Sequence, residues 1–317
     1  MKAINVLLAL VVSLLIGLAV FEGGLRLIGK GPQESLLEFD ATTGWGKKAN
    51  YEFDRSTPGY DVTIRTNAHG LNDDDAAGPG KAEGTFRVLT LGDSFTQGYS
   101  VDRAHLFVDV LERWWQDEGR QVEIVNAGTE PFDPAQQVAW LEAHGAEYAP
   151  DLVLLFPYQN DLYWNTQLSY QTPKGDREKP RYTEAGVLET GHIAEPAEES
   201  WLASTATANL FGGSKSDPSL HRFEIGGASV HREFAPLFED SDLNGSIRSH
   251  TAGALKAFSR VTQEIGARAL VVPIPDASLY ASTDASGVNQ SVTGGQLSGT
   301  ATPWSARTPF SSAINSS

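Results

Sequence analysis

The residues best suited to chemistry follow a short apolar run, Arg87-Val-Leu-Thr-Leu91, which predicts a buried strand. Gly92-Asp93-Ser94 comes next, just ahead of a helical segment. A glycine lets the chain turn sharply, and a serine at a helix start can present its hydroxyl beside the helix N-terminus. The pattern predicts that Ser94 is a nucleophile, although an Asp-Ser helix cap without catalysis fits the same three residues.

Two further polar segments follow two further predicted strands. Asn126-Ala-Gly128 comes after Val122–Val125, and Tyr158-Gln-Asn160-Asp161 comes after Leu152–Phe156. Because parallel strands end at the same edge of a sheet, we expect both segments to lie beside Ser94. The Gly128 N–H and the Asn160 amide are then predicted to face an oxyanion formed by Ser94 attack. A tight turn at Gly128 and an Asx turn at Asn160 are the alternatives without catalysis.

The order of these motifs resembles the SGNH hydrolase superfamily, also called GDSL lipases and esterases. Gly92-Asp93-Ser94 matches its first block, Gly128 its second, and Asn160-Asp161 its third, where Tyr158 stands in place of the usual glycine. The resemblance covers residues 87–275 and poorly covers 165–251. It implies that Ser94 is the nucleophile, that Ser94 N–H, Gly128 N–H and Asn160 form the oxyanion hole, and that Gly92, Asp93 and Asp161 support them. It also implies an α/β fold, a flavodoxin-like three-layer α/β/α sandwich with a mainly parallel sheet, and ester hydrolysis through an acyl-serine without cofactor or metal.

A base for Ser94 is missing from the sequence. A serine hydroxyl is a poor nucleophile unless a neighbouring group takes its proton. In the family that base is a histidine in an Asp-x-x-His turn near the C-terminus. Here no histidine follows His250, and Gly287 stands three residues after Asp284. Each of the other histidines is better explained as a surface or core residue: His69, His105, His144, His192, His221 and His231.

The N-terminus indicates a membrane segment. Lys2 precedes a nearly unbroken apolar run from Val6 to Phe21, close to the ~17-residue lower limit for a spanning helix. We predict an uncleaved signal anchor over residues 1–24; a cleaved signal peptide and a buried core helix are the alternatives. Asn67-Ala-His-Gly-Leu71, together with this segment, resembles bacterial membrane-anchored members of the family. The rest of the chain is therefore expected outside the cytoplasm, in a periplasmic or extracellular space.

Composition excludes several other classes of function. The formal net charge is −16 and the chain has no cluster of Lys and Arg, which disfavours nucleic-acid binding. The chain has no cysteine, which removes disulfides and Cys-based metal sites. No Glu/His pair has the spacing of a metal site, and no phosphate-binding glycine loop is present. The sequence therefore predicts neither a metal nor another cofactor, and it leaves the oligomeric state open.

Apolar periodicity predicts the remaining elements. Tyr60–Thr66 alternates as a half-buried strand does, and Ala269–Ile274 reads as a fourth strand of the main sheet. Helices are expected over three segments, of which the first carries its apolar residues on one face and the second begins at an Asp-Pro pair. These segments are 104–117, with Phe107, Val110, Leu111 and Trp114 on that face, 133–148, and 254–265. Alternating strands and helices predict a parallel sheet with helices on both faces.

We divide the chain into an anchor, a juxtamembrane region over 25–84, a hydrolase-like domain over 85–280 and a tail over 281–317. The domain contains an insertion over 165–251, and the tail is Ser-, Thr- and Gly-rich, as disordered or frame-shifted segments are. The leading hypothesis is an SGNH-type esterase acting on acyl esters, such as O-acetyl groups of a glycan, and impaired by the missing Asp-His pair. The alternatives are a non-catalytic binding or assembly module at the membrane, and a chain that does not fold stably.

Overall fold

The computed structural model describes most of the chain up to Pro275, in two compact units. The described residues are 2–28, 35–74, 77–172, 175–189, 193–195, 205–207, 222–225, 228–231 and 244–275. One unit contains the N-terminal helix and residues 205–207, and the other, from Leu36, contains the main sheet. The tail predicted over 281–317 lies outside the described residues, as do His192 and His221.

The N-terminal unit is dominated by one long apolar helix, α1 (Lys2–Leu27). Its Ile4–Leu27 stretch of 24 residues is long and apolar enough to cross a membrane, with a mean hydropathy of 2.8. Near the end of α1, the Glu22 carboxylate accepts hydrogen bonds from the Ala206 N–H at 2.8 Å and the Thr207 N–H at 2.9 Å.

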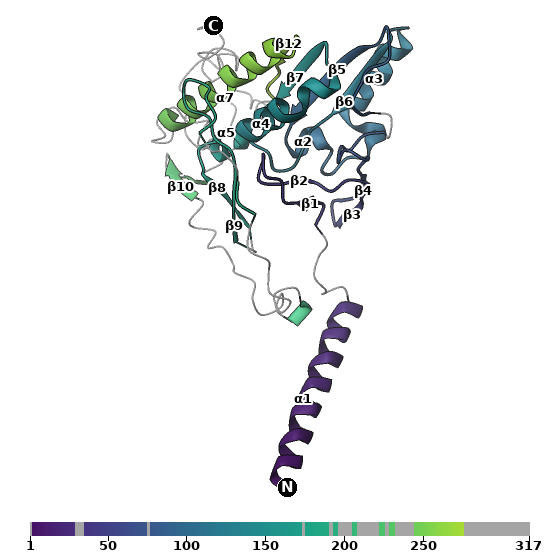
Figure 1. Ribbon diagram of the computed structural model, residues 1–317, viewed down its shortest axis with the longest axis vertical. Helices are drawn as coiled ribbons and strands as arrows, with labels where there is room; N and C mark the ends of the chain where they lie inside the picture. Colours follow the sequence, from purple (N-terminus) through teal and green to yellow (C-terminus); the bar gives the residue numbers. More distant parts are fainter. Residues whose placement is uncertain are drawn as a thin grey trace, which may run out of the picture. The chain divides into compact units, whose positions relative to one another are not determined.

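The second unit is a mixed α/β structure built on a parallel sheet of four strands (Figure 1). The strands are β5 (Phe86–Gly92), β6 (Val122–Asn126), β7 (Leu152–Phe156) and β12 (Arg268–Val271). They lie in the order β12-β7-β5-β6, and Gly92 pairs in register with Phe156. All four predicted strands are confirmed. The chain order reverses at β5, whose neighbours are the next two strands along the sequence, and ligands bind at such a switch point in open α/β sheets.

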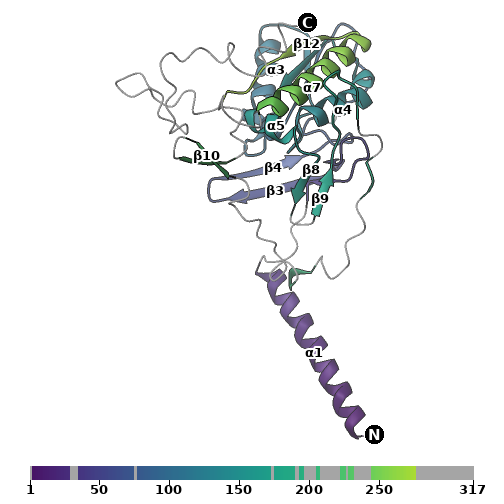
Figure 2. The same ribbon diagram turned by 90° about the vertical axis from the view of Figure 1, so that its left-hand side faces the viewer.

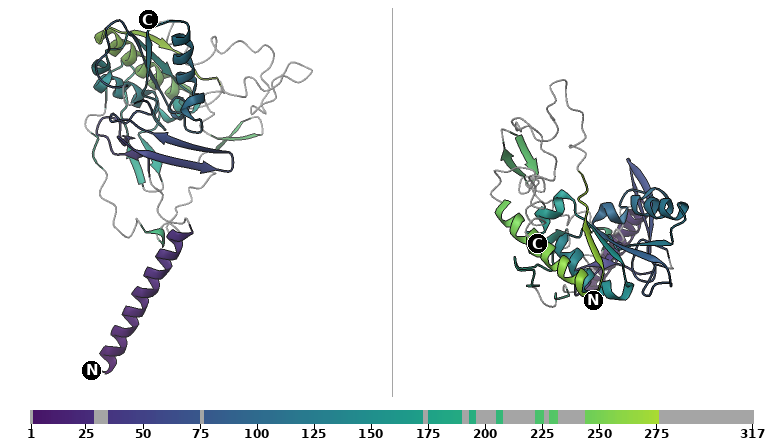
Figure 3. Two further views of the ribbon diagram at one scale, coloured as in Figure 1. Left: turned by 90° about the vertical axis from the view of Figure 1, so that its right-hand side faces the viewer. Right: turned by 90° about the horizontal axis from the view of Figure 1, so that it is seen from above.

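Helices cover both faces of this sheet, as the alternating pattern predicts. Val153 and Leu155 of β7 face the cluster formed with α4 (Pro134–His144) and α7 (Asn244–Glu264). Leu154 and Phe156 face α3 (Phe107–Asp117) on the other side. Seen from above, α7 and α3 lie on opposite sides of the sheet (Figure 3). The start of α4 is confirmed, because the Asp133 carboxylate accepts hydrogen bonds from the Ala135 and Gln136 N–H groups.

The apolar face predicted for α3 is only partly covered. Phe107, Val110 and Trp114 are 40%, 45% and 55% exposed, and Val108, which lies off the predicted face, is buried. On the edge strand, Leu270 is 52% exposed and has the same register as Leu154, so it lies on the α3 face of the sheet. The apolar period predicts that Phe107, Val110 and Trp114 share one face of the helix, but it does not predict which part of the chain packs against that face.

Two-stranded antiparallel pairs lie outside the main sheet, and several of their strands are labelled in Figure 2. They pair β1 (Leu37–Glu38) with β2 (Gly46–Lys47), β3 (Glu52–Thr57) with β4 (Tyr60–Arg65), β8 (Ser169–Thr172) with β9 (Gly175–Glu178), and β10 (Arg222–Ile225) with β11 (Ala228–His231). The strand predicted over 60–66 is confirmed as β4. The region 25–84 contributes buried residues to this unit from Leu36 onward, among them Trp45, Asn67 and Leu71.

Candidate active site

Ser94 lies where the sequence predicts, at the carboxyl end of β5. The strand ends at Gly92, and Ser94 is the first residue of the short helix α2 (Ser94–Gln97). Asp93 is the N-cap, and its carboxylate accepts a hydrogen bond from the Phe95 N–H at 2.9 Å. The Ser94 side chain is half-buried, and the N–H of a first helical residue has no partner within its helix. Ser94 therefore presents a hydroxyl and a backbone donor at the sheet edge.

Glycine is required at position 92 by close packing. A Cβ atom there would lie 2.0 Å from Thr96 Oγ1 and 2.6 Å from Thr96 Cβ. The strand thus turns directly into α2 with no room for a side chain between them. This contact supports the role predicted for Gly92 in shaping the turn that carries Ser94.

Asn160 reaches the same edge from the neighbouring strand. It is the second residue of α5 (Gln159–Trp164), which begins just after β7. Its Oδ1 atom is buried and has no hydrogen-bond partner among the described residues. This oxygen is a hydrogen-bond acceptor, whereas an oxyanion would need the Nδ2 group of the same amide as a donor. The oxyanion role of Asn160 therefore stays a prediction.

Asp93 and Asp161 stand at the starts of these two turns, and both side chains are buried. Burial raises the pKa of Asp93 to about 6, and burial together with the Asp93 charge raises the pKa of Asp161 well above its ordinary range. Asp161 accepts a hydrogen bond from the Tyr158 N–H at 3.0 Å. The two residues lie one position before Ser94 and one position after Asn160, and their supporting role stays a prediction.

Gly128 packs directly on α2. A Cβ atom at Gly128 would lie 2.6 Å from Gln97 N and 2.7 Å from Thr96 C, so only glycine allows this approach. Its N–H, however, donates to Asn126 Oδ1 at 3.0 Å. This N–H would have to leave Asn126 to meet an oxyanion, and the oxyanion role of Gly128 stays a prediction.

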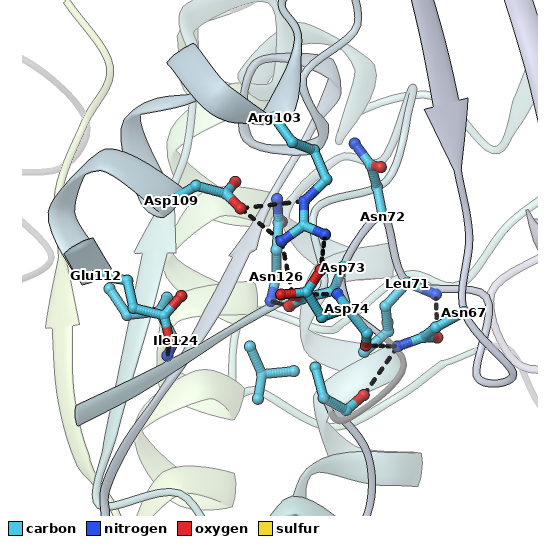
Figure 4. Close-up of polar contacts among 12 residues, drawn as sticks. Asn67, Leu71, Asn72, Asp73, Asp74, Arg103, Asp109, Glu112, Ile124 and Asn126 are labelled. Atoms are coloured by element: carbon cyan, nitrogen blue, oxygen red, sulfur yellow. Dashed lines mark hydrogen bonds and ion pairs between the residues drawn. The ribbon is translucent and has the colours of Figure 1, made fainter. Parts of the chain in front are cut away.

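A buried charged network that the sequence analysis missed supports the Gly128 loop (Figure 4). The Asp73 carboxylate accepts hydrogen bonds from the Asn126 N–H at 2.7 Å and from Arg103 Nη2 at 3.2 Å. Asn126 in turn donates through Nδ2 to the Thr96 carbonyl at 2.8 Å. Arg103 also contacts Asp74 at 2.7 Å and Asp109 at 2.6 Å. Asn72 and Asp73 are buried, whereas their composition alone suggests a surface connection.

Two buried lysines also lie at this edge. Lys47 donates through Nζ to the Gly128 carbonyl and, at 3.0 Å, to Thr129 Oγ1. Burial lowers the pKa of Lys47 to about 7. Lys179 forms a buried ion pair with Asp133 and donates to the Trp164 carbonyl at 2.6 Å. Nothing in the local sequence distinguishes either residue from a surface lysine.

Aromatic rings flank the nucleophile. The Phe95 ring lies 4.6 Å from the Tyr158 ring, and Phe95 is 48% exposed. Tyr158 occupies the position where the resembled family usually has glycine. The ring therefore adds an apolar surface beside the segment that carries Asn160.

Among the histidines whose side chains the structure describes, none forms a hydrogen bond with Ser94. His69 lies against Tyr148, His144 lies against Trp140, and His250 Nδ1 lies 2.8 Å from the Ser246 carbonyl on α7. His105 is an exposed residue of the 3-10 turn Arg103–His105. Within the described ranges, no three His, Asp or Glu side chains gather as metal ligands would.

Comparison with known proteins gives partial similarity to solved structures. No protein-family model and no curated protein matches the chain. Among solved structures, the chain is similar to TesA at 31% identity with a TM-score of 0.24, over 25% of this chain and 43% of that structure. It is also similar to AlinE4, an SGNH-hydrolase family esterase, at 17% identity with a TM-score of 0.24, over 60% of this chain and 77% of that structure. The chain thus spans less than half of the TesA structure.

Proposed function

We propose that this chain is a serine ester hydrolase of the SGNH/GDSL type, with the flavodoxin-like sandwich that this implies. The observation that carries the proposal is the placement of Ser94 and Asn160 at the carboxyl ends of paired strands β5 and β7. The order β6-β5-β7-β12 is 2-1-3-4 in chain order, which is how doubly wound flavodoxin-like sheets begin. In such sheets ligands bind between the first and third strands, which are β5 and β7 here.

The proposed reaction is acyl transfer to Ser94 followed by hydrolysis. Ser94 Oγ attacks the ester carbonyl carbon, its proton passes to a base, and the carbonyl oxygen becomes an oxyanion. The Ser94 N–H and the Asn160 amide stabilise this charge, and Gly128 N–H joins them if it leaves Asn126. The C–O bond to the alcohol then breaks, the alcohol takes up a proton, and water releases the acid from the acyl-serine.

The proposed substrate class is an acyl ester, such as the O-acetyl ester of a glycan. We further propose that α1 anchors the protein in a bacterial membrane and that the hydrolase domain lies outside the cytoplasm. The apolar 24-residue stretch of α1 supports the anchor. The reaction also needs a base that takes the proton of Ser94 Oγ, and among the described residues no hydrogen bond from Ser94 Oγ identifies it.

The test is hydrolysis of a small aryl acetate by the full-length protein in detergent. Ser94→Ala should abolish turnover, and Asn160→Ala should lower it about 10²–10³-fold, as loss of one oxyanion donor does. Ser100→Ala, an exposed serine just beyond α2, is the matched control and should leave the rate unchanged. A rate that survives Ser94→Ala would refute the proposed nucleophile.

The second candidate function is a non-catalytic binding or assembly module at the membrane. It needs only a binding surface at the strand ends and requires no base for Ser94. An ester that binds without turnover, and binds equally well to Ser94→Ala, would support this candidate over hydrolysis.

A further inference from the structure

We infer that Lys47 is a positioning residue for the proposed hydrolysis: its ammonium group orients the Gly128–Thr129 peptide and so fixes the Gly128 loop, residues 126–130, beside the Ser94 turn. In its catalytic consequence the inference rests on the proposed function. The orientation of the peptide does not, because it follows from contacts within the folded chain.

The first support is the pair of hydrogen bonds that Lys47 forms. Its Nζ atom donates to the Gly128 carbonyl oxygen and, at 3.0 Å, to Thr129 Oγ1, and the residue is only 8% exposed. The N–H of the same peptide, that of Thr129, donates to the Gly92 carbonyl at 3.0 Å. One peptide group therefore joins the lysine to the end of β5, two positions before Ser94.

The second support is that the buried charge of Lys47 is not used in an ion pair. Among the described residues, both of its hydrogen-bond acceptors are neutral oxygen atoms. The carboxylates that act on its charge are Glu130 and Asp73. Each of them pairs with an arginine instead, which is Arg55 at 2.6 Å for Glu130 and Arg103 at 3.2 Å for Asp73. Stability alone does not require such a charge, because an apolar residue of similar volume is often as stable in a buried position.

The third support is that Lys47 stands on a rigid part of the chain. It lies in β2 and pairs with Leu37 of β1. Gly70 has φ +71°, and a Cβ atom there would lie 2.5 Å from the Lys47 carbonyl oxygen, so only glycine allows this approach. The Asn67 Oδ1 atom closes the turn by accepting the Leu71 N–H at 3.1 Å. The Asn67–Leu71 motif of the sequence thus packs on the backbone that presents the lysine.

The arrangement has a consequence for the proposed oxyanion. When Lys47 loses its charge, the Gly128 carbonyl loses a charge-assisted hydrogen bond. The peptide is then held mainly by the Thr129 N–H, and the loop has more freedom relative to the Ser94 turn. Burial lowers the pKa of Lys47 to about 7, so this loss is expected as the pH rises through neutrality. A misplacement of about 1 Å at a site can lower the rate on the order of 10²-fold.

The first test is NMR of the full-length protein in detergent, isotope-labelled at the glycine carbonyl carbon and the threonine nitrogen. A carbonyl–nitrogen correlation spectrum then shows only Gly-Thr pairs, of which the sequence has three, at 84–85, 128–129 and 299–300. Lys47→Met should move the 128–129 signal and leave the other two in place. Lys48→Met is the matched control, because Lys48 lies over the Tyr51 ring at 4.5 Å, and it should move none of the three.

A second measurement needs no variant of Lys47. In the wild type, the 128–129 signal should move as the pH rises through about 7, where the lysine loses its charge. It should move in the same way in Asp73→Asn, which removes a neighbouring carboxyl group with a pKa of about 6. If Lys47→Met does not fold, this titration decides alone. A 128–129 signal that does not move in the titration, or in a folded Lys47→Met, would overturn the orienting role.

The rate of aryl acetate hydrolysis tests the catalytic consequence. At about pH 6, Lys47→Met should lower kcat about 10–10²-fold with little change in KM, because the oxyanion forms only in the transition state. At about pH 9 the wild-type lysine is uncharged and the two rates should converge, which a lysine that acts only through packing would not produce. A ratio of rates that is constant with pH would overturn the positioning role. If no turnover is found in any of the proteins, the proposed hydrolase fails, while the NMR signals still decide whether Lys47 orients the peptide.

Discussion

Asp73 gives a sharp test of the network behind the Gly128 loop. Its carboxylate accepts the Asn126 N–H at 2.7 Å and contacts Arg103 at 3.2 Å, and the residue is buried. Asp73→Ala leaves the buried Asn126 N–H without its acceptor, which costs about 1–3 kcal/mol. Arg103 keeps its ion pairs with Asp74 and Asp109 in this variant. The variant therefore loses only the partly exposed Arg103–Asp73 ion pair, which contributes about 0–1 kcal/mol of stability.

The expected sum is about 1–4 kcal/mol of unfolding free energy, reduced at neutral pH by one opposing effect. Burial raises the pKa of Asp73 to about 6, so the ionised carboxylate is itself unfavourable in the folded state. The stability this group contributes is complete below the unfolded pKa of 3.8 and is lost as the pH rises through about 6. Asp73→Ala should therefore cost more at about pH 5 than at about pH 8.

The assay is thermal unfolding of the full-length protein in detergent, followed by near-UV circular dichroism. Each kcal/mol corresponds to roughly 2–4 °C for a domain of this size, so Asp73→Ala should lower the Tm by about 2–16 °C. Asp74→Ala is the matched control, because Asp74 contacts the same arginine but has an 81% exposed side chain. Its Tm should change by no more than about 4 °C, and by less than that of Asp73→Ala.

Asp73→Asn separates the two contributions, since its side-chain oxygen still accepts the Asn126 N–H. It should lose less than half of what Asp73→Ala loses. Equal Tm values for Asp73→Ala and Asp74→Ala would refute the reasoning, and so would an asparagine as damaging as alanine.

Two further predictions concern the surroundings of the site. Gly128→Ala should lower the Tm and displace α2, because the new Cβ would lie 2.6 Å from Gln97 N. Gly245→Ala in α7 is the control and should be neutral or stabilising, because no atom lies within 4 Å of its Cβ. Equal Tm values for the two variants would contradict the close packing at Gly128. Burial raises the pKa of Glu112 to about 7, so its ionisation costs stability as the pH rises from the unfolded value of 4.5 through about 7. The Tm of Glu112→Gln relative to wild type should therefore increase between about pH 5 and pH 8, and a difference that is constant with pH would contradict this.

The parts of the fold that follow from local pattern were predictable from the sequence. The apolar runs at 87–91, 122–125 and 152–156 are strands because each is short, apolar and bounded by turn residues. Asp133-Pro134 begins α4 because its carboxylate caps the helix and proline needs no N–H there. Their common carboxyl edge then places Ser94, Gly128 and Asn160 near one another.

The contacts between distant segments were not predictable. Asp73 meets Arg103 across 30 residues, and Lys47 meets Gly128 across 81. Single-sequence patterns describe the period of a segment and not its tertiary partner, so these charged residues read as surface positions. The hydrogen bond from Gly128 N–H to Asn126 Oδ1 was not predicted either. An Asn-x-Gly segment can form an Asx turn of this kind, but the sequence pattern does not require it.

The partly uncovered face beside α3 has a consequence for handling the protein. A sheet edge with Leu270 52% exposed can pair with other strands, and Phe107, Val110 and Trp114 add apolar area nearby. A net charge of −16 keeps copies apart, but that repulsion reaches only about 8 Å at physiological ionic strength. Colloidal stability should thus depend on salt far more than folding does: dilute buffers favour dispersed protein, and concentrated salt favours edge-to-edge association.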